Sequence, residues 1–144
     1  MEMMISTKGR YALRLLIDIA ENQSGGYIRL RDVARRQEIS EKYLEIIVRA
    51  LVQEGCLVGV RGKGGGYRLS RQPEEYNIRQ VLEAAEGPLA PVVCLEGEPD
   101  CPRMSGCPTL PLWRGLDKVI SEYLDGFTLA DLMRAGGAGE PPKA

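Results

Sequence analysis

The sequence predicts a mainly α-helical fold that carries one small β-hairpin. Three amphipathic segments come before residue 54, and a turn separates the second from the third. Two short β-prone segments follow and flank a glycine-rich turn at residues 61–66. This order of elements (helix, helix, turn, helix, hairpin) is that of a winged helix-turn-helix. A long apolar helix near the C-terminus completes the predicted architecture.

The three N-terminal helices are predicted by apolar periodicity and by capping residues. They are expected at residues 7–22, 31–36 and 41–53. Ser6 or Thr7 can cap the first helix, and Ser40 can cap the third. Gly55 follows the third helix and is well placed to stop it. The third helix carries an apolar stripe with the spacing of one helix face, made by Leu44, Ile47, Val48 and Leu51.

The next segments change from helical to strand-like patterning. Residues 56–60 are apolar and β-prone, and residues 67–70 alternate between apolar and polar side chains. The basic, glycine-rich residues 61–66 lie between them, so a β-hairpin is expected, which we call the wing. Asn77 then caps a helix from Ile78 to about Glu86.

Residues 87–111 lose every regular period. They hold six prolines and three cysteines, and a structureless segment of this length in a compact domain is commonly functional or disordered. Residues 112–127 become helical again and are too apolar for one small domain to cover, so this helix is expected to pair with a second copy. Thr128 caps a last helix from Leu129 to about Ala135. The predicted organisation is a winged helix-turn-helix domain (1–86), a cysteine-containing sensor loop (87–111), a dimerisation helix with the terminal helix (112–135) and a flexible tail (136–144).

The composition restricts the function. The chain has 144 residues, of which 44% are hydrophobic and 27% charged, as in an ordinary globular domain. It has no histidine, the commonest general base and metal ligand, and no nucleophile–base pair is visible, so an enzyme is not expected. No apolar run approaches the roughly 18–20 residues of a membrane span, and no signal-peptide pattern is present. The expected location is therefore the cytoplasm, with no membrane partner.

The net charge of −1 conceals an asymmetry between the two halves of the chain. Residues 1–72 carry 13 Lys and Arg against 8 Asp and Glu, a net charge of +5. Residues 73–144 carry 6 against 12, a net charge of −6. A basic half favours a polyanionic partner, usually nucleic acid. The alternative is a solvated surface whose charge is uneven by accident, and the motifs have to decide between the two.

The candidate DNA-binding residues lie at the start of the third helix and in the wing. The N-terminal residues of a recognition helix reach base edges in the major groove. Lys42 can contact a guanine edge or a phosphate, and Glu45 can accept from a cytosine amino group. The candidates are Ser40, Lys42, Tyr43 and Glu45 in the third helix and Arg61, Lys63, Gly64 and Gly65 in the wing. Tyr43 can instead pack between helices, and Lys42 can be merely solvated. A nucleotide-binding loop is disfavoured, because the glycines lack the GxxxxGK[ST] form and precede a strand.

Three of the four cysteines form a cluster in the sequence. Cys94, Cys101 and Cys107 fall within 14 residues, whereas Cys56 stands alone. In a cytosolic chain such clustering favours metal or redox chemistry over structural disulfides. No pair has the CxxC spacing of a zinc knuckle or a thioredoxin-like site.

These motifs, taken in order, resemble the IscR/NsrR/CymR family of bacterial winged-helix transcription regulators. The matching stretches are residues 6–12, 40–45, 60–69, 83–87, 112–114 and 128–132. The Arg-Gly-x-Gly-Gly-Gly-Tyr wing at residues 61–67 is the most specific of them. The resemblance implies a homodimer built on the long C-terminal helix and a palindromic operator in double-stranded DNA. It also implies DNA contacts by Lys42, Tyr43, Glu45 and Arg61.

The cysteine segment resembles the loop that binds a [2Fe–2S] or [4Fe–4S] cluster in the iron–sulfur members. The resemblance implies that Cys94, Cys101 and Cys107 are the ligands, and it places Cys56 where the domain usually buries a leucine. The fourth ligand stays open, because Leu110 stands where some members have a ligating histidine and Arg10 where others have an acid. The candidates are a carboxylate of Glu96, Glu98 or Asp100, an acid of the other subunit, or an exogenous ligand.

Three functions compete at this point. The favoured one is a dimeric, sequence-specific DNA-binding regulator, expected to be a repressor, whose iron–sulfur cluster changes its DNA affinity. The second is the same scaffold acting as a thiol-redox or zinc switch without a cluster. The third is a regulator that binds a protein partner from cysteine or iron–sulfur metabolism.

Overall fold

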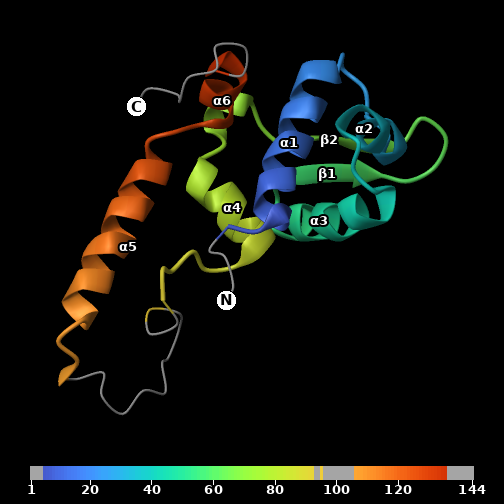
Figure 1. Ribbon diagram of the computed structural model, residues 1–144. Coiled ribbons are helices and arrows are strands. Elements are labelled where there is room, and N and C mark those ends of the chain that lie inside the picture. The colour runs from blue at the N-terminus through green and yellow to red at the C-terminus, as the bar shows by residue number, and fades with distance from the viewer. Residues whose placement is uncertain (1–4, 93–94, 96–105, 136–144) are drawn as a thin grey trace.

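The computed structural model describes residues 5–92, 95 and 106–135, and it confirms the predicted fold class (Figure 1). Helices surround one two-stranded antiparallel sheet. The elements are α1 (Thr7–Asn22), α2 (Leu30–Gln37), α3 (Glu41–Gln53), β1 (Leu57–Val60), β2 (Gly66–Leu69), the 3₁₀ helix η1 (Pro73–Glu75), α4 (Ile78–Glu86), α5 (Leu110–Asp125) and α6 (Leu129–Ala135). The sequence did not predict η1, which is a single turn that begins at a proline.

The predicted helix caps are confirmed. The Ser6 hydroxyl accepts a hydrogen bond from the Lys8 amide at 3.1 Å, at the start of α1. The Ser40 hydroxyl accepts from the Tyr43 amide at 3.3 Å, at the start of α3. Asn77 caps α4 in the same way. Each side chain satisfies an amide that the first helical turn leaves unpaired, which is why these helices begin where the sequence predicts.

The wing is a hairpin of two four-residue strands, and a third segment is bridged to it. β1 and β2 pair from Leu57 opposite Leu69 to Val60 opposite Gly66. Tyr67 also exchanges two backbone hydrogen bonds of 2.8 Å with Ile28, which precedes α2. The hairpin is therefore fixed to the helix-turn-helix, and its tip extends at the edge of the domain far from α5 (Figure 1).

The main core lies around α1, which packs on α2, α3, α4 and β2. The largest fully buried side chains of this core are Leu15, Leu16, Ile19, Val33, Leu44, Ile47, Leu51, Tyr76, Val81 and Leu129. Cys56 belongs to this core and is only 4% exposed, as expected from its place in the domain. A buried cysteine behaves as a small hydrophobe.

The terminal helix α6 returns to the first domain. The Leu129 amide donates to the Tyr76 carbonyl at 3.0 Å, and the Leu129 side chain is fully buried in the main core. A second, smaller apolar cluster of Ile78, Leu82, Leu89 and Phe127 joins α4 to the segments before α5 and α6. The sequence predicted no such contact between α6 and the main core.

Most of helix α5 stands apart from the helices around α1 (Figure 1), and its C-terminal end contacts α4 through Leu124 and Asp125. It begins at Leu110, two residues earlier than predicted, and Pro111 lies in its first turn. Proline fits this turn because the amide it lacks would have no helical partner there. Among the helices described here, none is long and apolar enough to cross a membrane.

Candidate DNA-binding surface and cysteine site

The recognition helix and the wing enclose a shared groove. It has a volume of about 550 Å³ and is lined by Glu41, Glu45 and Arg49 of α3 and by Val60, Arg61 and Tyr67 of the hairpin, among others. The structure thus brings Glu45 and Arg61, predicted from separate motifs, to one surface. A charged groove between a recognition helix and a wing can contact base edges and phosphates together.

The other predicted side chains flank this groove. Ser40 caps α3, and its side chain and that of Lys42 are exposed at the start of the helix. Lys63 and Gly64 are exposed at the tip of the wing. Arg49 is exposed and also lines the groove, although it was not predicted from the sequence. Its position four residues after Glu45, on the same helix face, was a signal for it.

Gly64 and Gly65 shape the wing in different ways. Gly64 has a φ of +80°, a conformation that side chains disfavour. Gly65 is buried, and a methyl group there would overlap the Val60 carbonyl oxygen. The Gly65 amide donates to the Gly62 carbonyl at 3.0 Å. Gly65 therefore keeps the turn tight and presents Arg61 and Lys63, while its own surface is covered.

Tyr43 turns toward α1 and is half-buried. Its hydroxyl lies 2.6 Å from the Thr7 hydroxyl, and its ring meets the Tyr11 ring edge to face at 5.8 Å between centroids. The packing alternative considered for Tyr43 is therefore the geometry observed. In this position Tyr43 holds the start of α3 against α1.

An ion pair between the buried Asp18 and the partly exposed Arg36 fixes α2 against α1. Asp18 is only 2% exposed, and its carboxylate accepts from Arg36 Nη2 at 2.6 Å and from Gln37 Nε2 at 2.8 Å. The hydrogen bond to Asp18 raises the pKa of Arg36. Both partners of Asp18 lie at the end of α2, immediately before the turn to α3. The pair therefore sets the geometry of the helix-turn-helix from inside the domain.

Cys107 lies just before α5, and its free thiol is half-exposed. Its sulfur is 3.2 Å from the Thr109 hydroxyl, and this hydrogen bond lowers the pKa of Cys107. A lowered pKa favours the thiolate, the form that binds metals and attacks oxidants. Cys94 and Cys101, together with the candidate fourth ligands Glu96, Glu98 and Asp100, lie outside the described residues.

Two positions that bear on the fourth ligand, Leu110 and Arg10, lie within the described residues. The described residues contain no group of three or more Cys, Asp or Glu side chains that could hold a metal ion. Leu110 is 6% exposed, and its apolar side chain offers no donor atom. Arg10 directs its guanidinium to the Ser6 carbonyl at 3.4 Å. Neither position flagged by the family resemblance therefore supplies a ligand.

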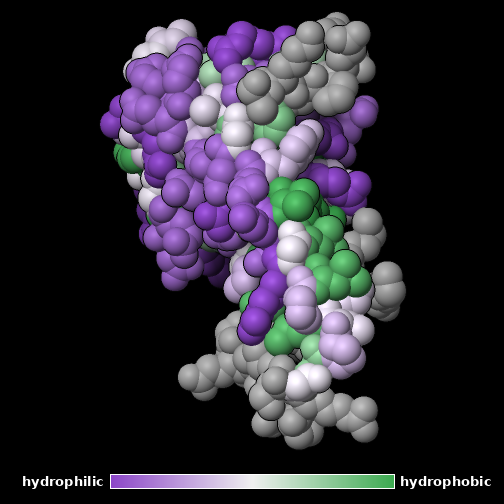
Figure 2. All heavy atoms as spheres, turned by 90° about the vertical axis from the view of Figure 1, so that its left-hand side faces the viewer, coloured by the Kyte–Doolittle hydropathy of each residue, from purple (hydrophilic) through white to green (hydrophobic). Residues whose placement is uncertain are grey.

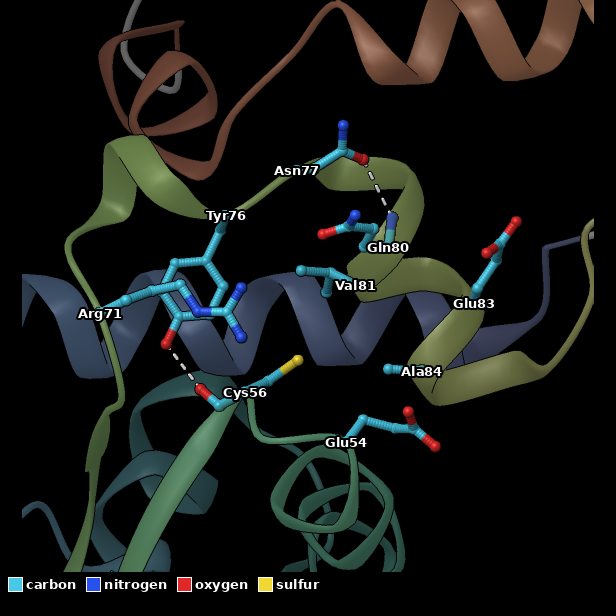
Figure 3. A pocket seen from close by; sticks show the side chains of 9 residues that line it. All are labelled: Glu54, Cys56, Arg71, Tyr76, Asn77, Gln80, Val81, Glu83 and Ala84. Carbon is cyan, nitrogen blue, oxygen red and sulfur yellow. Dashed lines mark hydrogen bonds between the residues drawn. The ribbon is translucent and has the colours of Figure 1, made fainter.

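Cys56 differs from Cys107 in its burial and in the direction in which its pKa is shifted. Burial raises the pKa of Cys56, and its carbonyl accepts from the Tyr76 hydroxyl at 2.6 Å. A pocket of about 300 Å³ lies beside it, between α4 and the chain after α3 (Figure 3). The Arg71 guanidinium covers the Tyr76 ring at 4.8 Å on one side of this pocket. Cys56 is thus held as a structural residue.

Helix α5 carries an apolar stripe that the described chain leaves largely uncovered, although the Tyr123 ring packs against Phe127. The side chains at spacings of four, three and four residues are Leu112, Leu116, Val119 and Tyr123, with exposures of 64%, 41%, 63% and 56%. Figure 2 shows the hydrophobic band that runs along this helix. A contiguous exposed apolar band of this kind marks an interaction surface.

The whole described chain has relatives among known proteins. Residues 5–135 match the Rrf2 family, described as iron-dependent transcriptional regulators. The chain is 42% identical over 132 residues to protein rrf2 of Nitratidesulfovibrio vulgaris Hildenborough, which covers 92% of this chain and 88% of that one. It matches the structure of CymR, the global cysteine regulator of B. subtilis, with a TM-score of 0.72 and 34% identity, covering 93% and 98%. The structure of T. potens IscR matches with a TM-score of 0.72 and 30% identity, covering 97% and 93%.

Proposed function

The chain belongs to the Rrf2 family of transcriptional regulators, and we propose that it is a homodimeric DNA-binding regulator that senses its signal through an iron–sulfur cluster. The family assignment confirms the resemblance to IscR and CymR regulators. The proteins that it matches are transcriptional regulators and not enzymes. The cluster, the homodimer and a repressor role are proposals that go beyond these comparisons.

The groove between α3 and the wing is the observation that carries the DNA-binding proposal. Arg49 and Arg61 face it from two elements, while Lys42 and Lys63 are exposed beside it. Cations in this arrangement neutralise phosphates on both sides of a major groove, and Glu45 is left to discriminate between bases. Binding at an operator then excludes other proteins from it, which is why repression is expected.

The uncovered stripe on α5 supports the homodimer. An identical stripe on a second copy is the occupant that the sequence itself provides, and a twofold axis makes such a patch complementary to itself. Two winged domains related by that axis would read two half-sites, which predicts a palindromic operator.

The cysteine chemistry supports a cluster. Cys94, Cys101 and Cys107 would hold it, since thiolates are the natural ligands of iron–sulfur clusters, and the lowered pKa of Cys107 suits that role. A bound cluster supplies a centre that responds to iron, sulfide and oxidant. The cysteine segment leaves the winged domain after α4 and reaches α5, so its ligation connects the DNA-binding part to the proposed dimer helix.

The second candidate is a thiol or zinc switch on the same scaffold. The observation that favours it is again the lowered pKa of Cys107, because a half-exposed thiolate is also a target for oxidants. The solved relative named as a global cysteine regulator matches the chain as well as the IscR structure does.

The colour and the iron content of anaerobically purified protein distinguish an iron–sulfur cluster from a thiol or zinc switch. The wild-type protein is expected to be coloured, with iron and acid-labile sulfide present, and Cys101→Ser is expected to lose the colour while its circular dichroism spectrum is retained. Colourless wild-type protein that cannot be reconstituted with iron and sulfide would favour the thiol or zinc switch. Full colour in the variant would exclude Cys101 as a ligand.

DNA binding is tested on a duplex selected by the wild-type protein from a random pool. Arg61→Ala is expected to weaken binding and to reduce the slope of log affinity against log salt by about one, as for the loss of one phosphate contact. Arg114→Ala is the matched control, because Arg114 is exposed on α5. Equal affinities and slopes for both variants would remove the wing from the mechanism.

A further inference from the structure

The last residue of α4 holds the first turn of α1. The Glu86 carboxylate accepts from the Ser6 amide at 2.6 Å and also from the Ser6 hydroxyl. It lies so close to α1 that a methyl group at Gly9 would be 2.8 Å from Glu86 Oε2. The partial positive charge of the unpaired amides at the N-terminus of α1 stabilises a carboxylate in this position. The contact joins residues that are 80 positions apart.

The same turn of α1 holds the start of the recognition helix. Thr7 follows Ser6 directly, and its hydroxyl lies 2.6 Å from the Tyr43 hydroxyl. Tyr11, one turn later, packs edge to face on the Tyr43 ring. The Tyr43 amide donates to the Ser40 cap of α3. The first turns of α1 and α3 are therefore tied together at Tyr43.

Glu86 also stands where the cysteine segment leaves the domain. Gly87 follows it with a φ of +91° and ends α4. Leu89 is buried in the second apolar cluster, against which Ile5 packs. The residues on both sides of Gly87 therefore contact the start of the chain. The Glu86 carboxylate binds Ser6, and Leu89 belongs to the apolar cluster on which Ile5 packs.

We propose that Glu86 is a positioning residue for the recognition helix. Its carboxylate fixes Ser6, the adjacent Thr7 fixes Tyr43, and Tyr43 fixes the first turn of α3, which carries Lys42. A movement of the chain after Gly87 would therefore shift Lys42 through the contacts of Glu86, Thr7 and Tyr43. This inference rests on the proposed function for its biological meaning, whereas the mechanical link itself does not require a cluster or DNA.

Hydrogen exchange of the free protein tests the link. Glu86→Gln keeps the side-chain shape but removes the charge that Ser6 contacts. Amide exchange in a peptide covering residues 40–46 is expected to accelerate by about threefold or more, as for coupling through a contiguous network. Glu83→Gln is the matched control, because it makes the same charge change one turn earlier, where the carboxylate contacts Arg79, and it is expected to leave this peptide unchanged.

A second variant on the route makes the test specific. Thr7→Val removes only the hydroxyl that meets Tyr43, so it is expected to accelerate the same peptide. Because both changes break one route, the double variant is expected to exchange no faster than the faster single variant. Acceleration confined to residues 5–12 in Glu86→Gln would overturn the proposal, since Glu86 would then be only a cap for α1. The proposal would also be overturned if the accelerations of exchange in Glu86→Gln and Thr7→Val multiplied in the double variant.

The affinity for the selected duplex tests whether the contacts of Glu86 influence DNA binding. Glu86→Gln is expected to lose about three- to tenfold in affinity, and the Glu83→Gln control is expected to retain it. An unchanged affinity in Glu86→Gln would overturn the role in DNA reading. Failure of the wild-type protein to bind DNA at all would count against the proposed function, and the exchange result would still decide whether Glu86 positions α3.

Discussion

Replacing Val119 by aspartate should dissociate the proposed dimer. Val119 lies near the middle of the α5 stripe and is 63% exposed. Burying a whole valine side chain stabilises by roughly 1.5–3 kcal/mol, so burying this exposed part contributes about 1–2 kcal/mol. A twofold axis makes the loss count twice, about 2–4 kcal/mol. Two carboxylates near the interface add a desolvation cost, and a total of at least about 4 kcal/mol weakens dimerisation roughly 1,000-fold.

Sedimentation velocity over a wide concentration range measures this effect. The wild-type protein is expected to sediment as a dimer, whereas Val119→Asp is expected to be a monomer with unchanged circular dichroism. Lys118→Glu is the control, because Lys118 is 75% exposed on the same helix and lies outside the stripe. Binding of the selected duplex should weaken in Val119→Asp and not in the control, since a palindrome needs two domains held together.

Two results would contradict a homodimer built on the α5 stripe. If Val119→Asp remains a dimer with a Kd within tenfold of the wild-type value, the stripe is not the interface. If the wild-type protein is a monomer at every concentration, the stripe has a different occupant, and the homodimer proposal fails with it.

Three further predictions concern stability and thiol reactivity. Asp18→Ala should lower the free energy of unfolding by about 1–3 kcal/mol, because the donors of Arg36 lose their buried acceptor. The loss stays in this range because the Arg36 side chain can still reach solvent. Urea titration measures the change, and an unchanged midpoint would contradict it. Cys107 should be alkylated by iodoacetamide before Cys56 in the native protein. The reason is that a hydrogen bond from Thr109 lowers the pKa of Cys107, whereas burial raises the pKa of Cys56. Peptide mapping reports the order of alkylation, and equal rates would contradict the prediction. The Thr128 amide lowers the pKa of Asp131 at the start of α6, so its stabilisation is present above the unfolded pKa of about 4 and is lost as the pH falls through the lowered value. The difference in unfolding midpoint between wild type and Asp131→Asn should therefore shrink between about pH 6 and about pH 3, and a constant difference would refute it.

The helices and the wing could be predicted from the sequence because their signals are local. The Ser6, Ser40 and Asn77 caps each bond an amide two or three residues away. The boundaries of α1 and α4 follow from these caps together with the apolar period. The glycine-rich turn likewise specifies the hairpin without help from the rest of the chain.

The candidate site could be predicted only in part. Exposed cations such as Arg61 and Lys63 are where the sequence placed them, because the turn alone presents them. The direction of Tyr43 could not be predicted, since a tyrosine at that helical position can face DNA or α1. Its partner Thr7 lies 36 residues earlier, and no local pattern connects the two.

The sequence by itself determined the order of the helices and the hairpin and indicated the family of the chain. It also indicated that α5 is too apolar to stand alone. Only the tertiary structure decided which elements meet. It placed α6 in the core of the winged domain, paired Asp18 with Arg36, and brought Glu86 to Ser6 across 80 residues. The physical reason is that caps, turns and periodicity act within a few residues, whereas contacts of this kind form when distant segments bury their apolar faces and carry the polar groups along.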